Sequence, residues 1–110
     1  MKDKIFKLSS SEIKEIIIPI GSCVASDKIT VEGLKVGYMY REESDFPADS
    51  GWRFFSGTED DDYINNPDNL MIYDVNTIVN YDLAIVKYLN SGVGVELERV
   101  SDNTFQIVSD

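Results

Sequence analysis

The fold is decided by Asp49-Ser50-Gly51-Trp52-Arg53-Phe54-Phe55-Ser56-Gly57, a dense aromatic segment that holds the single tryptophan of the chain. Both glycines accept backbone conformations that other residues avoid, so they predict turns on either side of a strand of about five residues. Successive side chains of a strand point to opposite faces. Trp52 and Phe54 therefore share one face, and Arg53 and Phe55 share the other. Bulky side chains on both faces predict a central strand that is covered on each side.

Arg53 would leave an unpaired charge near the core unless a carboxylate accompanies it. The acidic run Glu59-Asp60-Asp61-Asp62 follows shortly after the strand and is the nearest candidate partner. If Arg53 is buried and paired, the motif serves to hold the fold. If it is exposed beside the acidic run, it belongs to a partner surface. Trp52 has the same two interpretations, a core residue or an aromatic interface anchor.

Length and charge predict one domain over residues 1–110. A chain of this length buries roughly two thirds of its unfolded surface, enough to fold without metal or disulfide. Twenty acidic against ten basic residues give a net charge of −10, which argues against nucleic acids and anionic membranes as partners. A basic partner fits this charge, although charge that serves only solubility is the alternative.

The chain has one cysteine, Cys23, which cannot form an internal disulfide and is expected in the core. The apolar residues near the N-terminus are interrupted by a serine, glutamate and lysine run, so we expect neither a signal peptide nor a membrane span. Together these features predict a cytoplasmic protein.

The first half of the chain predicts one helix and three strands. Ser9-x-x-Glu12 has the spacing of a helix capping box, which predicts a short N-terminal helix. Ser22–Ser26 is expected to be a short strand, and 27–33 a connection with an extended piece at its centre. The alternation of 35–41 predicts a strand that pairs antiparallel with the Trp52 strand.

The second half predicts helices and then a hairpin. A helical turn is expected over Glu59–Ile64, followed by the turn 65–69. Asp74 and Asp82 are expected to cap two short helices. The alternation in 93–99 predicts a half-buried strand, and 104–108 a closing edge strand. The result is an α+β domain with a largely antiparallel sheet of about five strands, the short helices lying mainly between the third and fourth.

Catalytic chemistry finds little support in the sequence. The chain has no histidine, so the commonest general base and metal ligand is missing, and one cysteine cannot build an ordinary zinc site. No glycine-rich nucleotide-binding fingerprint occurs. Glu96 and Glu98 lie on the polar face of an amphipathic strand, which favours a solvated face over glycosidase chemistry. We expect no cofactor and no catalytic residue.

The acidic run has three interpretations. Glu59 and Asp60 can stabilise a helix N-terminus and pair with Arg53 or Arg41. The run can also form an exposed partner-binding patch. A third interpretation is a Ca²⁺ or Mg²⁺ site, but Ile64 stands where an alternating calcium loop needs another carboxylate.

Four stretches carry a family resemblance. They are Ser22-Cys23-Val24-Ala25-Ser26-Asp27-Lys28-Ile29, Val36-Gly37-Tyr38-Met39-Tyr40-Arg41-Glu42-Glu43, Asp49–Gly57 with Glu59, and Ile72-Tyr73-Asp74-Val75-Asn76-Thr77-Ile78. Over roughly residues 20–100 the chain resembles the immunity protein thirty-three-like family. The resemblance implies an immunity protein of a bacterial polymorphic toxin system that binds and blocks a toxin, and it carries over no catalytic residue. Asp82-Leu83 departs from the family pattern, where a proline is expected, which leaves that helix boundary open.

The leading hypothesis is thus a non-enzymatic protein that neutralises a cognate toxin with a basic surface. The alternative is a regulatory module that binds a small molecule or divalent cation, suggested by the clustered carboxylates. The candidate partner-binding residues are Arg41, Trp52, Arg53, Glu59, Asp60, Asp61, Asp62 and Tyr63.

Overall fold

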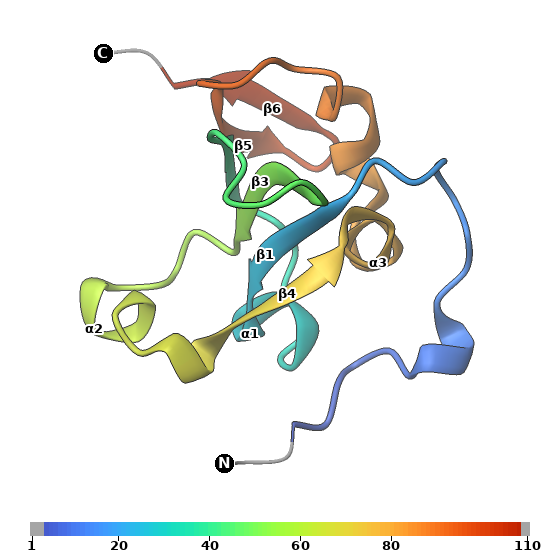
Figure 1. The fold of residues 1–110 in the computed structure, drawn as a ribbon. Coiled ribbons are helices and arrows are strands. Elements are labelled where there is room, and N and C mark those ends of the chain that lie inside the picture. The colour runs from blue at the N-terminus through green and yellow to red at the C-terminus, as the bar shows by residue number, and fades with distance from the viewer. Residues whose placement is uncertain (1–3, 109–110) are drawn as a thin grey trace.

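The aromatic segment forms β3 (Asp49–Phe55), which lies in the interior of the sheet in a computed structural model that describes residues 4–108 (Figure 1). Within those residues the sheet has six strands in the order β4-β1-β3-β2-β5-β6. β1 and β3 run parallel, and every other neighbouring pair runs antiparallel. The other strands are β1 (Ser22–Ser26), β2 (Tyr38–Arg41), β4 (Leu70–Asp74), β5 (Glu96–Ser101) and β6 (Thr104–Ile107).

Short helices supply the second layer. α1, α3 and η3 bury apolar side chains against one face of the sheet, whereas α2 has no buried residue. The predicted α+β class with a largely antiparallel sheet is confirmed. The α-helices are α1 (Asp27–Thr30), α2 (Asp61–Ile64) and α3 (Val75–Tyr81), and the 3₁₀ helices are η1 (Ser10–Glu12), η2 (Pro67–Asn69) and η3 (Leu83–Tyr88).

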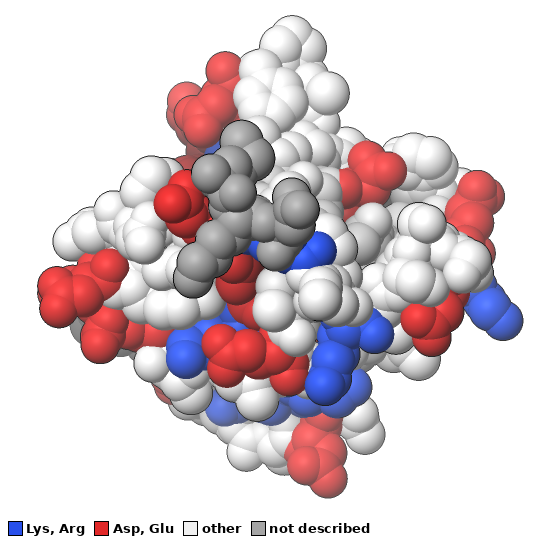
Figure 2. Space-filling view, turned by 90° about the horizontal axis from the view of Figure 1, so that it is seen from below, with Lys and Arg blue, Asp and Glu red and all other residues white. Residues whose placement is uncertain are grey.

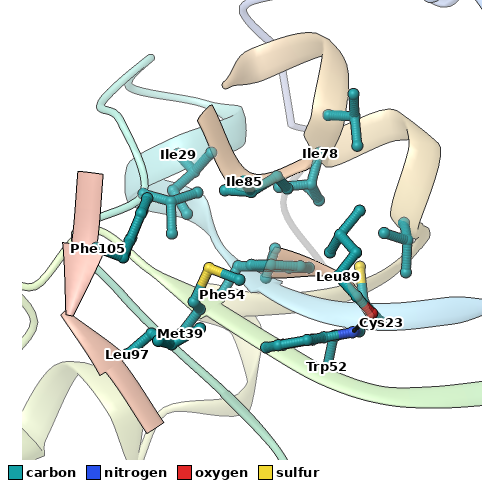
Figure 3. Close-up of a cluster of buried hydrophobic side chains, with 14 residues drawn as sticks. Cys23, Ile29, Met39, Trp52, Phe54, Ile78, Ile85, Leu89, Leu97 and Phe105 are labelled. Atoms are coloured by element: carbon teal, nitrogen blue, oxygen red, sulfur yellow. Dashed lines mark hydrogen bonds between the residues drawn. The ribbon is translucent and has the colours of Figure 1, made fainter. Parts of the chain in front are cut away.

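The core lies between this helical layer and the inner face of the sheet (Figure 3). Trp52 and Phe54 are fully buried there, with stacked rings 5.9 Å apart. Cys23 is also fully buried, and burial raises the pKa of its thiol well above the ordinary value. Ile78 and Ile85 close the core from the helices. The alternation predicted for β3 is therefore confirmed, because Arg53 and Phe55 lie on the opposite face.

A bulge in β3 corrects the role predicted for Gly51. Between two paired positions β1 advances from Ser22 to Val24, while β3 advances from Asp49 to Arg53. Gly51 takes up the extra length with a φ of 88°, in the left-handed region that favours glycine. The strand thus begins at Asp49 and passes through Gly51, which does not bound it. Gly57, with a φ of 94°, does lie in the turn after the strand, as predicted.

The predicted N-terminal helix is limited to η1. Glu12 accepts a hydrogen bond from the backbone N–H of Ser9, as in a capping box, but the helix ends at Glu12. The segment that follows is bound by side chains of α3. Asn76 Oδ1 accepts from the N–H groups of Ile16 and Ile17. These contacts fix the segment in a non-helical conformation, so tertiary contacts override its local preference.

Two short elements were not predicted. Residues 27–30 were expected in a connection, but Ser26 accepts a hydrogen bond from the N–H of Lys28 and caps α1. β4 was missed because five residues next to a turn-rich segment give little periodicity. Asp74 and Asp82 both occupy N-cap positions, as predicted, but only Asp82 makes a capping hydrogen bond, from the N–H of Ala84. η3 begins directly after Asp82 although the expected proline is absent.

None of the helices within residues 4–108 is long and apolar enough to span a membrane.

Candidate functional site

The outer face of the sheet, opposite the helical layer, carries a cluster that we call the open face. β2 lies between β3 and β5, and its side chains on this face pair with theirs. Tyr38 is level with Phe55 on one side and Glu98 on the other, and Tyr40 is level with Glu96. The tyrosines are half-buried, and both glutamates are exposed. We define the open face as Tyr38, Tyr40, Phe55, Glu96 and Glu98.

The three rings of the open face pack on one another. The centroids of Tyr40 and Phe55 lie 6.1 Å apart in parallel planes, and those of Tyr38 and Tyr40 lie 5.7 Å apart. The Tyr38 hydroxyl donates a hydrogen bond of 2.5 Å to a carboxylate oxygen of Glu96. Burial, and then the neighbouring Glu96, raise the pKa of Tyr38 well above its ordinary value. The ring therefore stays neutral, and the cluster is rigid.

A hollow of about 480 Å³ lies over these rings. It is lined by the three rings, by Gly37 and Gly57, and by Glu59, Ile64, Glu98 and Arg99. Its volume falls in the range of sites that bind small ligands or single side chains. The hollow thus adjoins the acidic run.

Arg53 lies at the end of the open face nearest Tyr40, under the loop 42–49. Its guanidinium makes a bidentate pair with Asp49, at 2.9 and 2.8 Å, and donates to Glu42 at 2.7 Å. The side chains of Arg53 and Asp49 are only 5% and 2% exposed. Hydrogen bonds from Arg53 hold the pKa of Asp49 well below its ordinary value. Asp45, which is 79% exposed, adds a further contact at 3.5 Å.

These partners correct the prediction for the acidic run, because the run does not pair with Arg53. Glu59 instead accepts hydrogen bonds from the N–H groups of Ser56 and Gly57, both at 2.9 Å. Burial acts to raise the pKa of Glu59, but these and other hydrogen bonds lower it overall. The run begins beyond the C-terminal end of β3, whereas Asp49 lies at its N-terminal end. The bulge at Gly51 brings Asp49 back toward Arg53.

The rest of the run forms and flanks α2. Asp60 accepts a hydrogen bond from the N–H of Tyr63 and so caps the helix, which confirms the helix-stabilising interpretation for this residue. Asp61 and Asp62 are exposed. Tyr63 is half-buried, with the ammonium of Lys28 5.0 Å from its ring centroid.

Trp52 and Arg41 form a unit on the inner face. The indole of Trp52 is fully buried, and its Nε1 donates to the carbonyl of Leu89 at 3.4 Å. The Arg41 guanidinium lies 5.7 Å from the ring centroid and donates to the carbonyls of Ser50 and Ser91. Of the candidate residues, the structure therefore groups Arg41 with Trp52, encloses Arg53 in carboxylates, and leaves Asp61 and Asp62 in solvent.

The open face itself was not predicted as a site. The alternation of 35–41 and 93–99 places its tyrosines and glutamates on strand faces. That alternation was the available signal in the sequence. What the sequence lacked was the pairing of β2 with β5, which brings Glu96 and Glu98 beside the tyrosines. The partners of Arg53 were missed for a similar reason, since only the bulge shows that Asp49 can reach it.

Metal and hydrolytic chemistry gain no geometric support. Across the described part of the chain, no group of three Cys, Asp or Glu side chains is arranged to hold a metal ion. Glu96 and Glu98 are exposed, unlike the enclosed carboxylic acid that a glycosidase uses as its proton donor.

Charge is unevenly arranged over the surface. Figure 2 views the molecule from below Figure 1, with Asp and Glu spread widely over the surface and Lys and Arg gathered in the lower middle. Some of the basic groups are neutralised by ion pairs, for example Lys4 with Asp27 and Lys28 with Glu32. Twenty acidic against ten basic residues give the chain a net charge of −10.

The comparisons with known proteins agree with the sequence resemblance. A family model described as the immunity protein Imm33 domain matches residues 23–109. The match covers the whole open face, the Arg53 cluster and α2. No curated protein and no solved structure matches the chain.

Proposed function

The chain belongs to the Imm33 immunity protein family, and from this membership we propose that it neutralises a cognate toxin by binding it directly. The observation that carries the proposal is the family match over most of the chain. The surface chemistry supports it, since the net charge of −10 suits a partner with a basic surface. Neutralisation by association needs no catalytic group, so the proposal does not depend on one.

The contact surface in this proposal is the acidic side of the molecule around α2. Asp61 and Asp62 are exposed there and can meet a cationic surface directly. Glu59, Asp60 and Tyr63 hold the local backbone, so they position the two free carboxylates. Trp52 and Arg53 are buried in the sheet, and Arg41 is held against Trp52, so these three residues need not touch the partner.

Co-expression with a candidate toxin chosen from the neighbouring genes tests the proposal. Cells that produce the toxin alone are expected to die, and cells that also produce this chain are expected to grow. The purified proteins should then elute as a stoichiometric complex in size-exclusion chromatography. If the toxin kills equally with and without this chain, toxin neutralisation is wrong.

The variant Asp61→Lys/Asp62→Lys tests the assigned surface separately. Reversing two exposed charges is expected to weaken the complex about tenfold, because each exposed charge contributes a few tenths to one kcal/mol and reversal replaces attraction by repulsion. Glu15→Lys/Glu43→Lys is the matched control, since it changes the net charge equally at two exposed positions outside α2. Equal affinity of both variants would remove α2 from the contact surface.

A further inference from the structure

The open face combines three packed rings with two exposed carboxylates, and its nearest basic groups are already bound. Arg53 is enclosed by Asp49 and Glu42. Arg99, at the rim of the hollow, is held by Asp82 and donates to the carbonyl of Val36 at 2.8 Å. The face therefore offers acceptors and aromatic surface, and among residues 4–108 both arginines that border it are held in ion pairs.

Both features suit a cationic side chain. The faces of tyrosine and phenylalanine rings attract a cation, and exposed carboxylates beside them supply a counter-charge. A guanidinium matches this combination better than an ammonium, because its plane stacks on a ring while its edge donates two parallel hydrogen bonds to a carboxylate. The rings are held by mutual packing and by the Tyr38–Glu96 hydrogen bond, so little ordering is required on binding.

We propose that the hollow of the open face receives an arginine side chain presented by the toxin. The guanidinium lies over Tyr38 and Tyr40, and Glu98, which lines the hollow, accepts its hydrogen bonds. Glu96 does not line the hollow; it holds the Tyr38 hydroxyl and adds negative charge beside it. This inference rests on the proposed function and names the anchor of the contact. It also extends the contact surface from α2 to β2 and β5, because Glu59 and Ile64 join the hollow to the acidic run.

The acidic run alone offers a poorer seat for such a side chain. Carboxylates of both sites already accept hydrogen bonds, Glu59 and Asp60 from the local backbone and Glu98 from Gln106. The ring of the acidic run, Tyr63, is however already occupied, since the Lys28 ammonium lies 5.0 Å from its centroid. Asp61 and Asp62 are exposed on a helix of four residues, and neither lines the hollow. A cation there would gain a screened surface attraction only. At the open face it also gains desolvated contact with the rings, the kind of contact that dominates interface energies.

The test is an NMR titration of the isotope-labelled chain with Nα-acetyl-arginine methylamide. Saturable shifts are expected at the amides of Tyr38, Tyr40, Phe55, Glu96 and Glu98. The matching citrulline compound has nearly the same shape without the charge, so it is expected to give no saturable shift. Glu96→Lys/Glu98→Lys is expected to weaken arginine binding about tenfold, whereas the control Glu15→Lys/Glu43→Lys stays within about twofold of the parent.

Three outcomes overturn the inference. They are shifts centred on Asp60–Asp62, the absence of saturation, or equal binding by the open-face and control variants. The dispersed spectrum of each variant verifies that it is folded. A chain that protects cells from the toxin but does not bind arginine at the open face would refute this inference and leave the proposed function intact. Loss of protection by the parent chain would refute the proposed function itself.

Discussion

At the scale of single residues, Arg53 determines how the central motif is used. Its guanidinium is buried, and burying this charge destabilises the fold unless every N–H donor finds an acceptor. Asp49 takes two of its donors and Glu42 a third, so the pairing is nearly complete. Asp49 also accepts from the N–H of Gly51 at 2.9 Å. One carboxylate therefore ties the guanidinium to the bulge, and this residue pair belongs to the stability of the fold.

Replacing Asp49 by asparagine is expected to lower the free energy of unfolding by about 3 kcal/mol at neutral pH, because it leaves a buried guanidinium partly unpaired. Glu42→Gln is the matched control at the same arginine. The Glu42 side chain is 48% exposed, so its loss is expected to cost less than about 1 kcal/mol. Urea denaturation measures both. Equal losses would show that Asp49 is not the principal partner.

The pH dependence of the same variants has a definite sign. Arg53 lowers the pKa of Asp49 in the folded chain below its ordinary value of 3.8, so the unfolded chain takes up the proton first as the pH falls. The contribution of Asp49 is thus fully present above about pH 4 and is lost toward the depressed folded value. The difference between parent and Asp49→Asn should accordingly shrink at about pH 2.5 relative to pH 7.

At the scale of elements, the bulge in β3 creates the setting of Arg53. Gly51 has a φ of 88°, and a Cβ built there would lie 2.1 Å from the carbonyl oxygen of Glu42. The same backbone accepts a hydrogen bond of 3.0 Å from the N–H of Glu42. Only a residue without a side chain fits between the two strands at this point. The bulge therefore joins β2, β3 and the loop 42–49 into one unit.

Gly51→Ala is expected to lower the free energy of unfolding by about 3 kcal/mol or more, since it adds a backbone clash to the cost of a left-handed alanine. Gly57→Ala separates the two effects. Its φ is 94°, but its Cβ would meet nothing closer than 3.8 Å, so about 1 to 2 kcal/mol is expected. Gly92→Ala, which meets nothing within 4 Å, should be nearly neutral. Thermal denaturation that ranks the three otherwise would contradict this account.

At the scale of the whole molecule, the helices cover one face of the sheet, and the rings of Tyr38 and Tyr40 on the other face stay half-buried. The core is completed by Trp52, Phe54 and the helical isoleucines, so the outer rings are not needed to close it. The excess of carboxylates then acts over the surface as a whole. Its negative potential should speed the encounter with a basic toxin more than it tightens the final complex.

Salt dependence tests this property of the whole surface. The association rate with the toxin is expected to fall at least about tenfold between roughly 20 and 300 mM NaCl, because the ions screen the attraction at a distance. The dissociation rate should change much less. Stopped-flow fluorescence of the two mixed proteins can measure both rates. An association rate that does not respond to salt would contradict electrostatic steering.

Local pattern was enough to predict much of the fold. The alternation in β2, β3 and β5 gave their faces correctly, and Asp60, Asp74 and Asp82 marked helix starts. Local pattern was insufficient where a segment is short, or where contacts with distant residues determine its conformation. The isoleucine-rich segment after Glu12 illustrates the second case, because Asn76 binds its backbone from α3.

The sequence by itself determined the class of the fold, the burial of one face of β3, the acidic surface and the family. Each of these depends on composition, on neighbouring residues or on a linear motif. Only the tertiary structure decided which carboxylates enclose Arg53 and which residues form the open face. Both depend on β3 with its neighbours: the bulge shifts Asp49 toward Arg53, and the order β3-β2-β5 brings Phe55, Tyr38 and Glu98 together from three distant segments. Which distant strands pair cannot be read from the residues of any one strand.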